Sequence, residues 1–391
     1  YFVTADDSSA IRFYPMAEYS EPGIYEVRGT VVELDATNPQ PDMDQVWDYS
    51  NFAGFWYGLD DDLATETLTI NRSALSYPSD RVLDEGTVVY ETYPVYQEYE
   101  LHKNLGLTVE SDYPGGDSGY FIEGFMADEY VAIDNNANKL CKLLVEFKDD
   151  DRKILATGEE WYLGGGFVLV LNQIDPEGGK VWFSLYKDGK ELDSEVISCG
   201  SGDNHQDRVY TYTADIGWEE DIPVFSCYMD AIFRGNSNIV QVMYVFLIDD
   251  TMLTIDTGDE SGHMKVVTAC SAGITLINDE TIDLDAGTTE QITDNIYFRI
   301  ADDDVLRFYP FVERTIRGAV PPTSEEPQEE LLDSDGDGVP DLRDEEPDTP
   351  QGYLVNSEGI GRMWGDMNSD DRLTSVDALT LLQAVAGKIG L

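Results

Sequence analysis

The chain has 391 residues, of which 78 are acidic and 24 are basic, so its formal net charge is −54. A field of this sign repels nucleic acids and anionic lipid head groups, which argues against both as partners. It also opposes folding unless cations screen it. Hydrophobic residues make up 42% of the chain, enough for two or three domains with folded cores.

The apolar runs of the chain are short. The longest, residues 242–248 and 167–171, fall well below the roughly 20 residues that a membrane helix needs. We therefore expect no direct membrane span. The first residue is Tyr1 and no signal peptide follows it, which indicates a processed or excised chain.

Two distant stretches of the chain are nearly the same. Residues 1–18 read YFVTADDSSAIRFYPMAE, and residues 297–313 read YFRIADDDVLRFYPFVE. The sequence RGTV at residues 28–31 likewise returns as RGAV at residues 317–320. A fixed long period is typical of tandemly repeated domains. We therefore expect residues 1–27 to be the terminal strand of a preceding copy, followed by one whole copy.

Residues 1–313 have the pattern of an all-β fold, because runs of Val, Ile, Tyr, Phe and Trp alternate with Gly, Asp and Asn. Residues 167–198 predict a three-stranded meander with turns at Glu177–Gly179 and at Asp188-Gly189. Further strands are predicted at 24–34, 53–57, 66–70, 87–96, 120–126, 142–147, 239–248, 264–269 and 296–311. Many short strands separated by turns favour sandwiches.

The composition changes near residue 320. Residues 321–350 contain six prolines and a dense acidic run, so they cannot form an apolar core. We expect an acidic, proline-rich linker at 314–332, stiffened by proline and extended by like charges. A small calcium-binding loop–helix module is expected at 333–391.

The first calcium loop is predicted at residues 333–344, DSDGDGVPDLRD. Calcium takes six to eight oxygen ligands, which a 12-residue loop supplies from positions 1, 3, 5, 7, 9 and 12. The candidate ligands are Asp333, Asp335, Asp337, Val339 through its carbonyl, Asp341 and Asp344. Gly338 permits the sharp turn, and the segment resembles a thrombospondin type 3 calcium loop. The alternative is a solvated acidic linker.

A second calcium loop is predicted at residues 366–377, DMNSDDRLTSVD. Its candidate ligands are Asp366, Asn368, Asp370, Arg372 through its carbonyl, Thr374 through a water, and Asp377. With the amphipathic helix that follows, it resembles one half of a type I dockerin, which implies calcium binding and docking onto cohesin domains. It departs from that pattern at Asp371, where glycine is usual, and it lacks a second loop–helix unit unless the first loop replaces it. The alternative is a calcium-stiffened cap.

Signals for catalysis are weak. Residues 115–120 read GGDSGY, but a nucleophile at Ser118 needs a base held against it, and the histidines of the chain are His102, His205 and His263. We expect a loop turn there, and a turn or bulge at residues 164–166, GGG. The sequence predicts no catalytic residues and no enzyme.

Other residues leave alternatives open. Cys141, Cys199, Cys227 and Cys270 form no CxxC pair, so they predict either two disulfides or four thiols. Asn71 begins the Asn-Arg-Ser sequon, a candidate glycosylation site. Residues 60–62, three aspartates, form either a calcium-tuned turn or a solvated loop.

Residues 28–313 resemble the S-layer family duplication domain of methanogenic archaea. The resemblance is carried by RGTVVELD, FAGFWYGLDDDLATETLTI, YFIEGFMADEYVA, KVWFSLYKDGKELDSEVIS, DIPVFSCYMDAIFRG, GITLINDETIDLDAG and IADDDVLRFYPFVE. It implies paired β-sandwich subdomains in tandem copies that tile into a porous acidic lattice. We divide the domain into residues 28–137 plus 251–313 and residues 138–250.

We therefore expect an extracellular structural protein of the cell envelope that assembles with itself into an archaeal surface layer, sheath or filament, stabilised by Ca²⁺. Residues 1–15 either add a strand to a neighbouring copy or are the remnant of a first copy. The main alternative is a dockerin-bearing adaptor docked onto a cohesin scaffold. A secreted hydrolase or carbohydrate-binding module is a third.

Overall fold

The computed structural model describes residues 2–4, 13–15, 21–35, 37, 40–75, 81–109, 116–200, 204–234, 238–316, 353–355 and 361–363. The predicted calcium module at 333–391 therefore lies outside the described residues, apart from two short strands. The linker was predicted to begin at residue 314, but residues 314–316 end the strand Leu306–Ile316, and residues 317–332 lie outside the described residues. The chain divides into two units, residues 1–317 and 318–391. In the second unit, β30 (Tyr353–Val355) pairs with β31 (Gly361–Met363).

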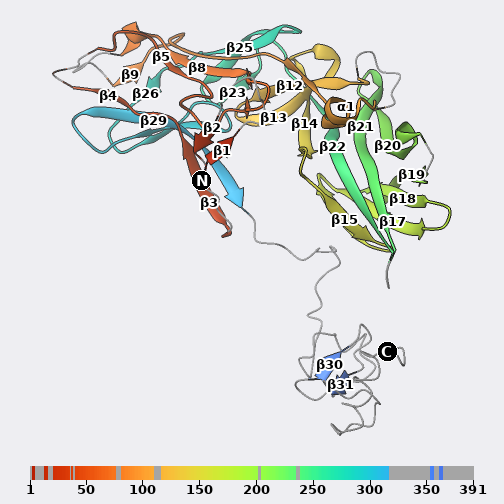
Figure 1. Cartoon of the computed structure of the whole chain (residues 1–391). Helices are drawn as coiled ribbons and strands as arrows, with labels where there is room; N and C mark the ends of the chain where they lie inside the picture. Colours follow the sequence, from red (N-terminus) through yellow and green to blue (C-terminus); the bar gives the residue numbers. More distant parts are fainter. Residues whose placement is uncertain are drawn as a thin grey trace. The chain divides into compact units, whose positions relative to one another are not determined.

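The first unit contains two β-sandwiches, drawn side by side in Figure 1. The six-stranded sheet of the first sandwich has the order β23 (Glu260–Ser261), β24 (Met264–Cys270), β25 (Gly273–Asn278), β10 (Val88–Thr92), β8 (Glu66–Ile70) and β5 (Gln45–Trp47). Its five-stranded sheet has the order β27 (Thr289–Gln291), β28 (Ile296–Ile300), β29 (Leu306–Ile316) and β3 (Gly23–Arg28), with β4 (Val32–Leu34) also on β29.

The second sandwich is built from an eight-stranded and a four-stranded sheet. The larger has the order β11 (Val95–Glu98), β12 (Gly119–Phe125), β13 (Asp128–Ala132), β14 (Lys139–Glu146), β22 (Ile239–Thr254), β21 (Glu219–Phe233) and β20 (Val209–Ile216), with β15 (Lys153–Ala156) also on β22. The smaller has the order β16 (Glu160–Gly164), β17 (Phe167–Asp175), β18 (Lys180–Lys187) and β19 (Lys190–Ser198).

Short elements complete the unit. They are the strand pairs β6 (Tyr57–Gly58) with β7 (Leu63–Ala64) and β9 (Val82–Leu83) with β26 (Ile282–Asp283), the helix α1 (Glu100–Leu105), and the 3₁₀ turns η1 (Arg72–Ala74), η2 (Ile133–Asn135) and η3 (His205–Arg208). The predicted all-β fold of paired sandwiches is confirmed for this part of the chain.

Each sandwich has its own hydrophobic core. Trp47, Phe298 and Phe308 lie fully buried in the first core, in tilted or edge-on contact with one another. Phe167, Phe183 and Phe225 are fully buried in the second. Burying such rings supplies most of the energy that offsets chain entropy and charge repulsion.

The sequence analysis placed the boundary between the two sandwiches at residues 137 and 138. The two hydrophobic cores divide the chain at other positions. The chain leaves the first sandwich after Thr92, and Tyr99 and Ile122 already belong to the second core. Pro94 lies at the crossing, where it cannot donate a ladder hydrogen bond, so β10 and β11 become separate strands. The chain returns after Thr254, and Ile255 packs in the first core.

Most predicted strands form, with four corrections. The meander at 167–198 is confirmed as β17, β18 and β19, and Asp188 and Gly189 take the positive φ values, 49° and 76°, that its tight turn requires. Residues 53–56 are turns, because the Phe52 amide donates to Asp48 O (2.8 Å) and the Phe55 amide to Phe52 O (3.1 Å). The single strands predicted at 24–34, 87–96 and 296–311 are each two strands.

The repeated sequence forms the same hairpin twice. β1 (Phe2–Thr4) pairs with β2 (Phe13–Pro15), with Phe2 opposite Pro15 and Thr4 opposite Phe13. β28 and β29 pair with Phe298 opposite Pro310 and Ile300 opposite Phe308, which are the same residues of the repeat. The predicted terminal strand is therefore a hairpin. The second hairpin closes its own sandwich, because β29 also pairs with β3.

Candidate functional site: the joint between the sandwiches

The turn between β12 and β13 joins the two sandwiches. Both strands belong to the eight-stranded sheet of the second sandwich, yet Phe125, Met126 and Ala127 at the turn are buried in the core of the first. Met126 and Ala127 have φ values of 52° and 66°. Positive φ at two non-glycine residues is unfavourable, so the surrounding contacts must hold the turn in place.

The first sandwich supplies hydrogen-bonding groups to this turn from β8 and β10. The Gly124 amide donates to Thr65 Oγ1 (2.9 Å), and Thr92 Oγ1 donates to the Gly124 carbonyl (2.6 Å). The Met126 amide donates to the Tyr90 hydroxyl (2.8 Å), and the Ala127 amide donates to Glu66 Oε1 (2.8 Å). Tyr90 in turn donates to Glu66 (2.7 Å).

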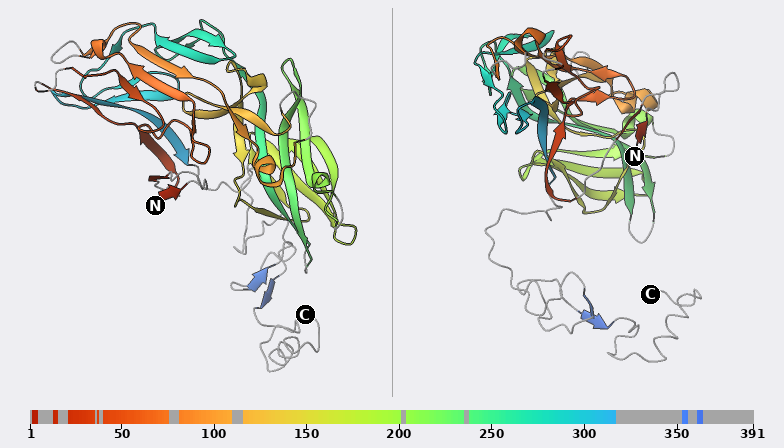
Figure 2. Two further views of the ribbon diagram at one scale, coloured as in Figure 1. Left: turned by 45° about the horizontal axis from the view of Figure 1, so that its top comes forward. Right: turned by 90° about the vertical axis from the view of Figure 1, so that its left-hand side faces the viewer.

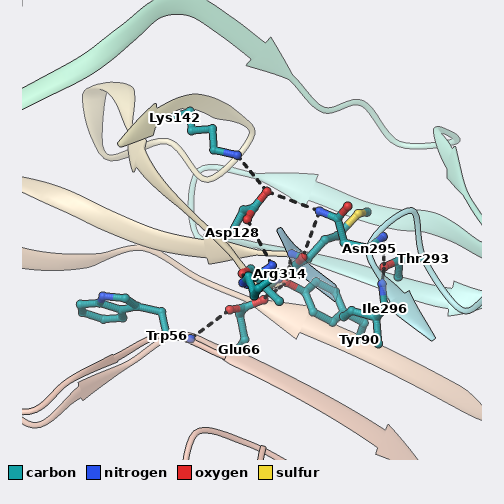
Figure 3. Close-up of polar contacts among 11 residues, drawn as sticks. Trp56, Glu66, Tyr90, Asp128, Lys142, Thr293, Asn295, Ile296 and Arg314 are labelled. Carbon is teal, nitrogen blue, oxygen red and sulfur yellow. Dashed lines mark hydrogen bonds and ion pairs between the residues drawn. The ribbon is translucent and has the colours of Figure 1, made fainter. Parts of the chain in front are cut away.

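The five-stranded sheet completes the clamp from the other side (Figure 3). Asn295 donates to the Met126 carbonyl (3.3 Å), and Arg314 donates to the Ala127 carbonyl. Arg314 also lies 3.6 Å from Asp128, which binds Lys142 of the second sandwich at 3.0 Å. The buried amides and carbonyls of the turn therefore have partners from three separate segments, and unpaired they would each cost about 1–3 kcal/mol.

Glu66 is the centre of the clamp. Its side chain is buried, and burial raises its pKa to about 7, although the hydrogen bonds from Ala127, Tyr90 and Trp56 and the nearby charge of Arg314 lower it. The Trp56 amide lies 3.5 Å from Glu66 Oε2, as Figure 3 shows. A carboxylate that accepts several N–H and O–H groups is well suited to hold the ends of three segments together.

Glu123, on strand β12, is buried as Glu66 is, but its carboxyl group lacks the hydrogen bonds that Glu66 accepts. It is 0% exposed, and among the described residues neither carboxyl oxygen has a hydrogen-bond partner. Burial raises its pKa to about 9, and the nearby charge of Glu66 adds to the shift. Glu123 is therefore protonated at neutral pH, because an unpaired carboxylate in this place would cost far more than the neutral acid.

The predicted calcium ligands, Asp333 to Asp344 and Asp366 to Asp377, all lie outside the described residues. Within the described ranges, no group of three or more His, Cys, Asp or Glu residues is placed to hold a metal ion. Residues 60–62 form the turn between β6 and β7, where Asp61 lies 3.6 Å from Lys103 and Asp62 accepts a hydrogen bond from Tyr57 (2.6 Å).

Among the described residues, no histidine forms a hydrogen bond with Ser118. Its hydroxyl lies 3.2 Å from the Tyr96 hydroxyl. The histidines contact other groups: His102 Nδ1 the Leu107 carbonyl (3.0 Å), His205 Nδ1 the Tyr228 hydroxyl (3.3 Å), and His263 Nδ1 the Gln291 carbonyl (2.5 Å). The predicted glycine turn at 164–166 is confirmed by positive φ values in all three residues.

The cysteines and the sequon complete the predicted residues. All four cysteines are thiols in this structure, with Cys141 and Cys227 buried and Cys270 exposed. Asn71 is exposed beside η1, and its Oδ1 accepts hydrogen bonds from the Ser73 amide (2.9 Å) and hydroxyl (2.7 Å).

Comparison with known proteins gives the family. The model of the S-layer protein family matches residues 36–302, which include both sandwiches and the joint. The chain belongs to the S-layer protein family. A major S-layer protein of Methanosarcina mazei is 36% identical over 326 residues, or 82% of this chain and 45% of the relative. One of Methanosarcina acetivorans is 35% identical over 335 residues, or 84% of this chain and 46% of the relative.

This S-layer family chain thus spans less than half the length of these relatives. No helix among its described residues is long and apolar enough to cross a membrane.

The joint was not predicted from the sequence. A signal was present for Glu66, because the alternation of ETLTI assigns it to the same buried face as Leu68 and Ile70. Glu123 had no such signal, because GYFIEGF does not alternate and is buried at nearly every position.

We predict that Gly124→Ala loosens the joint. A Cβ at Gly124 would lie 2.7 Å from Glu66 Cδ and 2.9 Å from Thr65 Oγ1, so the clamp must move. The expected loss is about 3 kcal/mol of unfolding free energy, measured by denaturant titration. Gly23→Ala is the control, because its Cβ would have 3.4 Å of room. Equal stability of both variants would contradict the clamp.

The buried carboxyls predict a pH dependence of stability. The pKa values of Glu66 and Glu123, about 7 and about 9, lie above the ordinary value of 4.5, so the folded state holds more protons. Their contribution is complete below pH 4.5 and is lost as pH rises to about 9. Glu123→Gln should flatten the fall of stability between pH 5 and 9 by several kcal/mol. Glu91→Gln, at an exposed position of β10, should keep the wild-type slope.

Proposed function

We propose that this chain is an extracellular structural unit of an archaeal cell-surface layer, in which copies assemble with one another. The observation that supports this most directly is the family match over residues 36–302, since relatives of the chain are named major S-layer proteins. The clamped joint supports the same role. A lattice needs units that hold their shape under load, and the joint ties two sandwiches through buried hydrogen bonds.

Assembly of copies of this chain must overcome the electrostatic repulsion between them. Copies with a net charge of −54 repel one another, and divalent cations relieve that repulsion best. We propose that Ca²⁺ binds the two C-terminal loops, at Asp333–Asp344 and Asp366–Asp377, and also bridges acidic surfaces. Carboxylates along the pores of such a layer would slow anions and let small neutral or cationic solutes pass.

Catalysis and docking are not part of the proposal. Relatives are named as surface-layer proteins, and Ser118 faces Tyr96 instead of a histidine. Nothing in the family match supports the cohesin-bound adaptor, so we do not retain it. Asn71, exposed at the start of η1, stays a proposed glycosylation site.

We predict that electron microscopy of the purified chain with millimolar calcium shows an ordered sheet, tube or filament. A chelator should fray the assembly, because the acidic faces then repel, and raised ionic strength should partly restore it. Asp335→Asn with Asp337→Asn should weaken the calcium effect. Assembly and thermal stability that do not change on chelation would contradict the role of calcium.

We further propose that residues 1–15 take part in assembly as a hairpin added to a neighbouring copy, the alternative being the remnant of a preceding copy. The shared register of β1–β2 and β28–β29 supports either reading. Deletion of residues 1–20 should then abolish ordered assembly and leave the melting temperature unchanged within a few degrees. Normal polymer from the shortened chain would contradict hairpin addition.

A further inference from the structure

A cavity of about 340 Å³ lies where the two sandwiches meet, a region that Figure 2 shows from two further sides. The second sandwich supplies Met126 and Tyr130 of the β12–β13 hairpin and Leu253 of β22, and the first supplies Val266 of β24 and Asp294 of the turn between β27 and β28. This volume falls within the range of sites for small organic molecules, about 300–1,000 Å³. Because both sandwiches line it, the cavity exists only while the joint is intact.

The floor of the cavity is apolar. Four buried side chains form it, those of Phe125, Met126, Ile255 and Val266. The buried Ser261 hydroxyl donates to Met126 Sδ (3.3 Å) and accepts a hydrogen bond from the amide of Asp294, which is exposed at the rim (2.9 Å). These bonds fix the floor and the rim to each other. A ligand with an apolar body would therefore find a preformed surface on which it loses contact with water.

The charged residues that line the cavity are all acidic: Asp259, Glu260 and Asp294. Glu260 pairs with Lys265 across the β23–β24 hairpin, and Lys265 Nζ lies 3.0 Å from its carboxylate. The Val266 amide donates to the Asp259 carbonyl (2.8 Å). This bond places Asp259 opposite Val266, on the face of the hairpin that lines the cavity and away from Lys265.

Two carboxylates therefore remain to meet a ligand. Asp259 Oδ2 accepts a hydrogen bond from the Asp256 amide (2.8 Å). Among the described residues, Asp259 Oδ1 and the carboxylate of Asp294 have no hydrogen-bond or ion-pair partner. The rim thus carries negative charge beside an apolar floor, and a matching ligand needs a positive charge beside an apolar body.

We propose that the cavity binds a small organic cation, in which an ammonium group is joined to an apolar body. The ammonium group would lie at Asp259 and Asp294. The apolar body would cover Met126 and Val266 beside Tyr130, an aromatic residue that also attracts cations. The carboxylates would repel an anion. A bare metal ion is a poor match, because among the described residues no group of three or more His, Cys, Asp or Glu is placed to hold one.

Such a ligand would stabilise the joint between the sandwiches. It would contact Met126 of the clamped turn and Asn295, whose side chain donates to the Met126 carbonyl (3.3 Å) and which also lines the cavity. A ligand that binds only the folded chain raises the melting temperature as its concentration rises. A single copy supplies every lining residue, so binding does not depend on the proposed assembly.

The test titrates the full chain, in chelator, with benzylammonium, benzyl alcohol and benzoate, which share one ring and differ in charge. Met126 is the reporter: in a chain labelled with ¹³C-methyl methionine, its signal is identified by its loss in Met126→Leu. Benzylammonium should shift this signal and raise the melting temperature by a few degrees. Benzyl alcohol should bind at least about tenfold more weakly, and benzoate should leave the signal unchanged.

Asp294→Asn removes the charge at nearly constant shape, so it should weaken benzylammonium about threefold to fivefold and leave benzyl alcohol unchanged. Asp283→Asn is the matched control, because Asp283 is exposed on β26 and does not line the cavity, and it should bind as wild type does. Unchanged circular dichroism would verify that both variants fold. Equal binding of the three compounds, no shift of the Met126 signal, or an equal loss in Asp283→Asn would overturn the inference.

Discussion

The arrangement of the first unit depends on the hydrogen bonds of one turn. This turn connects two strands of the second sandwich but is buried in the core of the first. The β12–β13 turn projects from the second sandwich into the first, where its amides and carbonyls lose water. Glu66, Tyr90, Asn295 and Arg314 replace that water with hydrogen bonds. Since each bond needs a defined distance and direction, the clamp ties the two sandwiches to each other.

Charge is the second constraint on the molecule. A chain with 78 acidic residues must either expose, pair or protonate its carboxyls. Among the described residues, seven of the nine lysines form ion pairs, Glu66 accepts hydrogen bonds from N–H and O–H donors, and Glu123 stays neutral because burial raises its pKa to about 9.

Sequence patterns succeeded where local chemistry decides the structure and failed where distant contacts do. The meander at 167–198 follows from alternation and from the turn at Asp188-Gly189. Residues 53–56 have strand-like composition, but Phe52 and Phe55 reach the core from turns, so packing overrides propensity. The strand predicted at 87–96 is divided between two sheets, with Pro94 at the crossing and Tyr99 already in the second core.

The sequence by itself determined the all-β class, the repeated segment, the acidic character and the resemblance to the S-layer family, because these depend on alternation, turn residues and composition. Only the tertiary structure decided the joint and the boundary between the cores. Thr65, Tyr90, Gly124, Asn295 and Arg314 meet although they are up to 249 positions apart in the chain. No local pattern encodes such contacts, since only the tertiary fold brings these distant residues together.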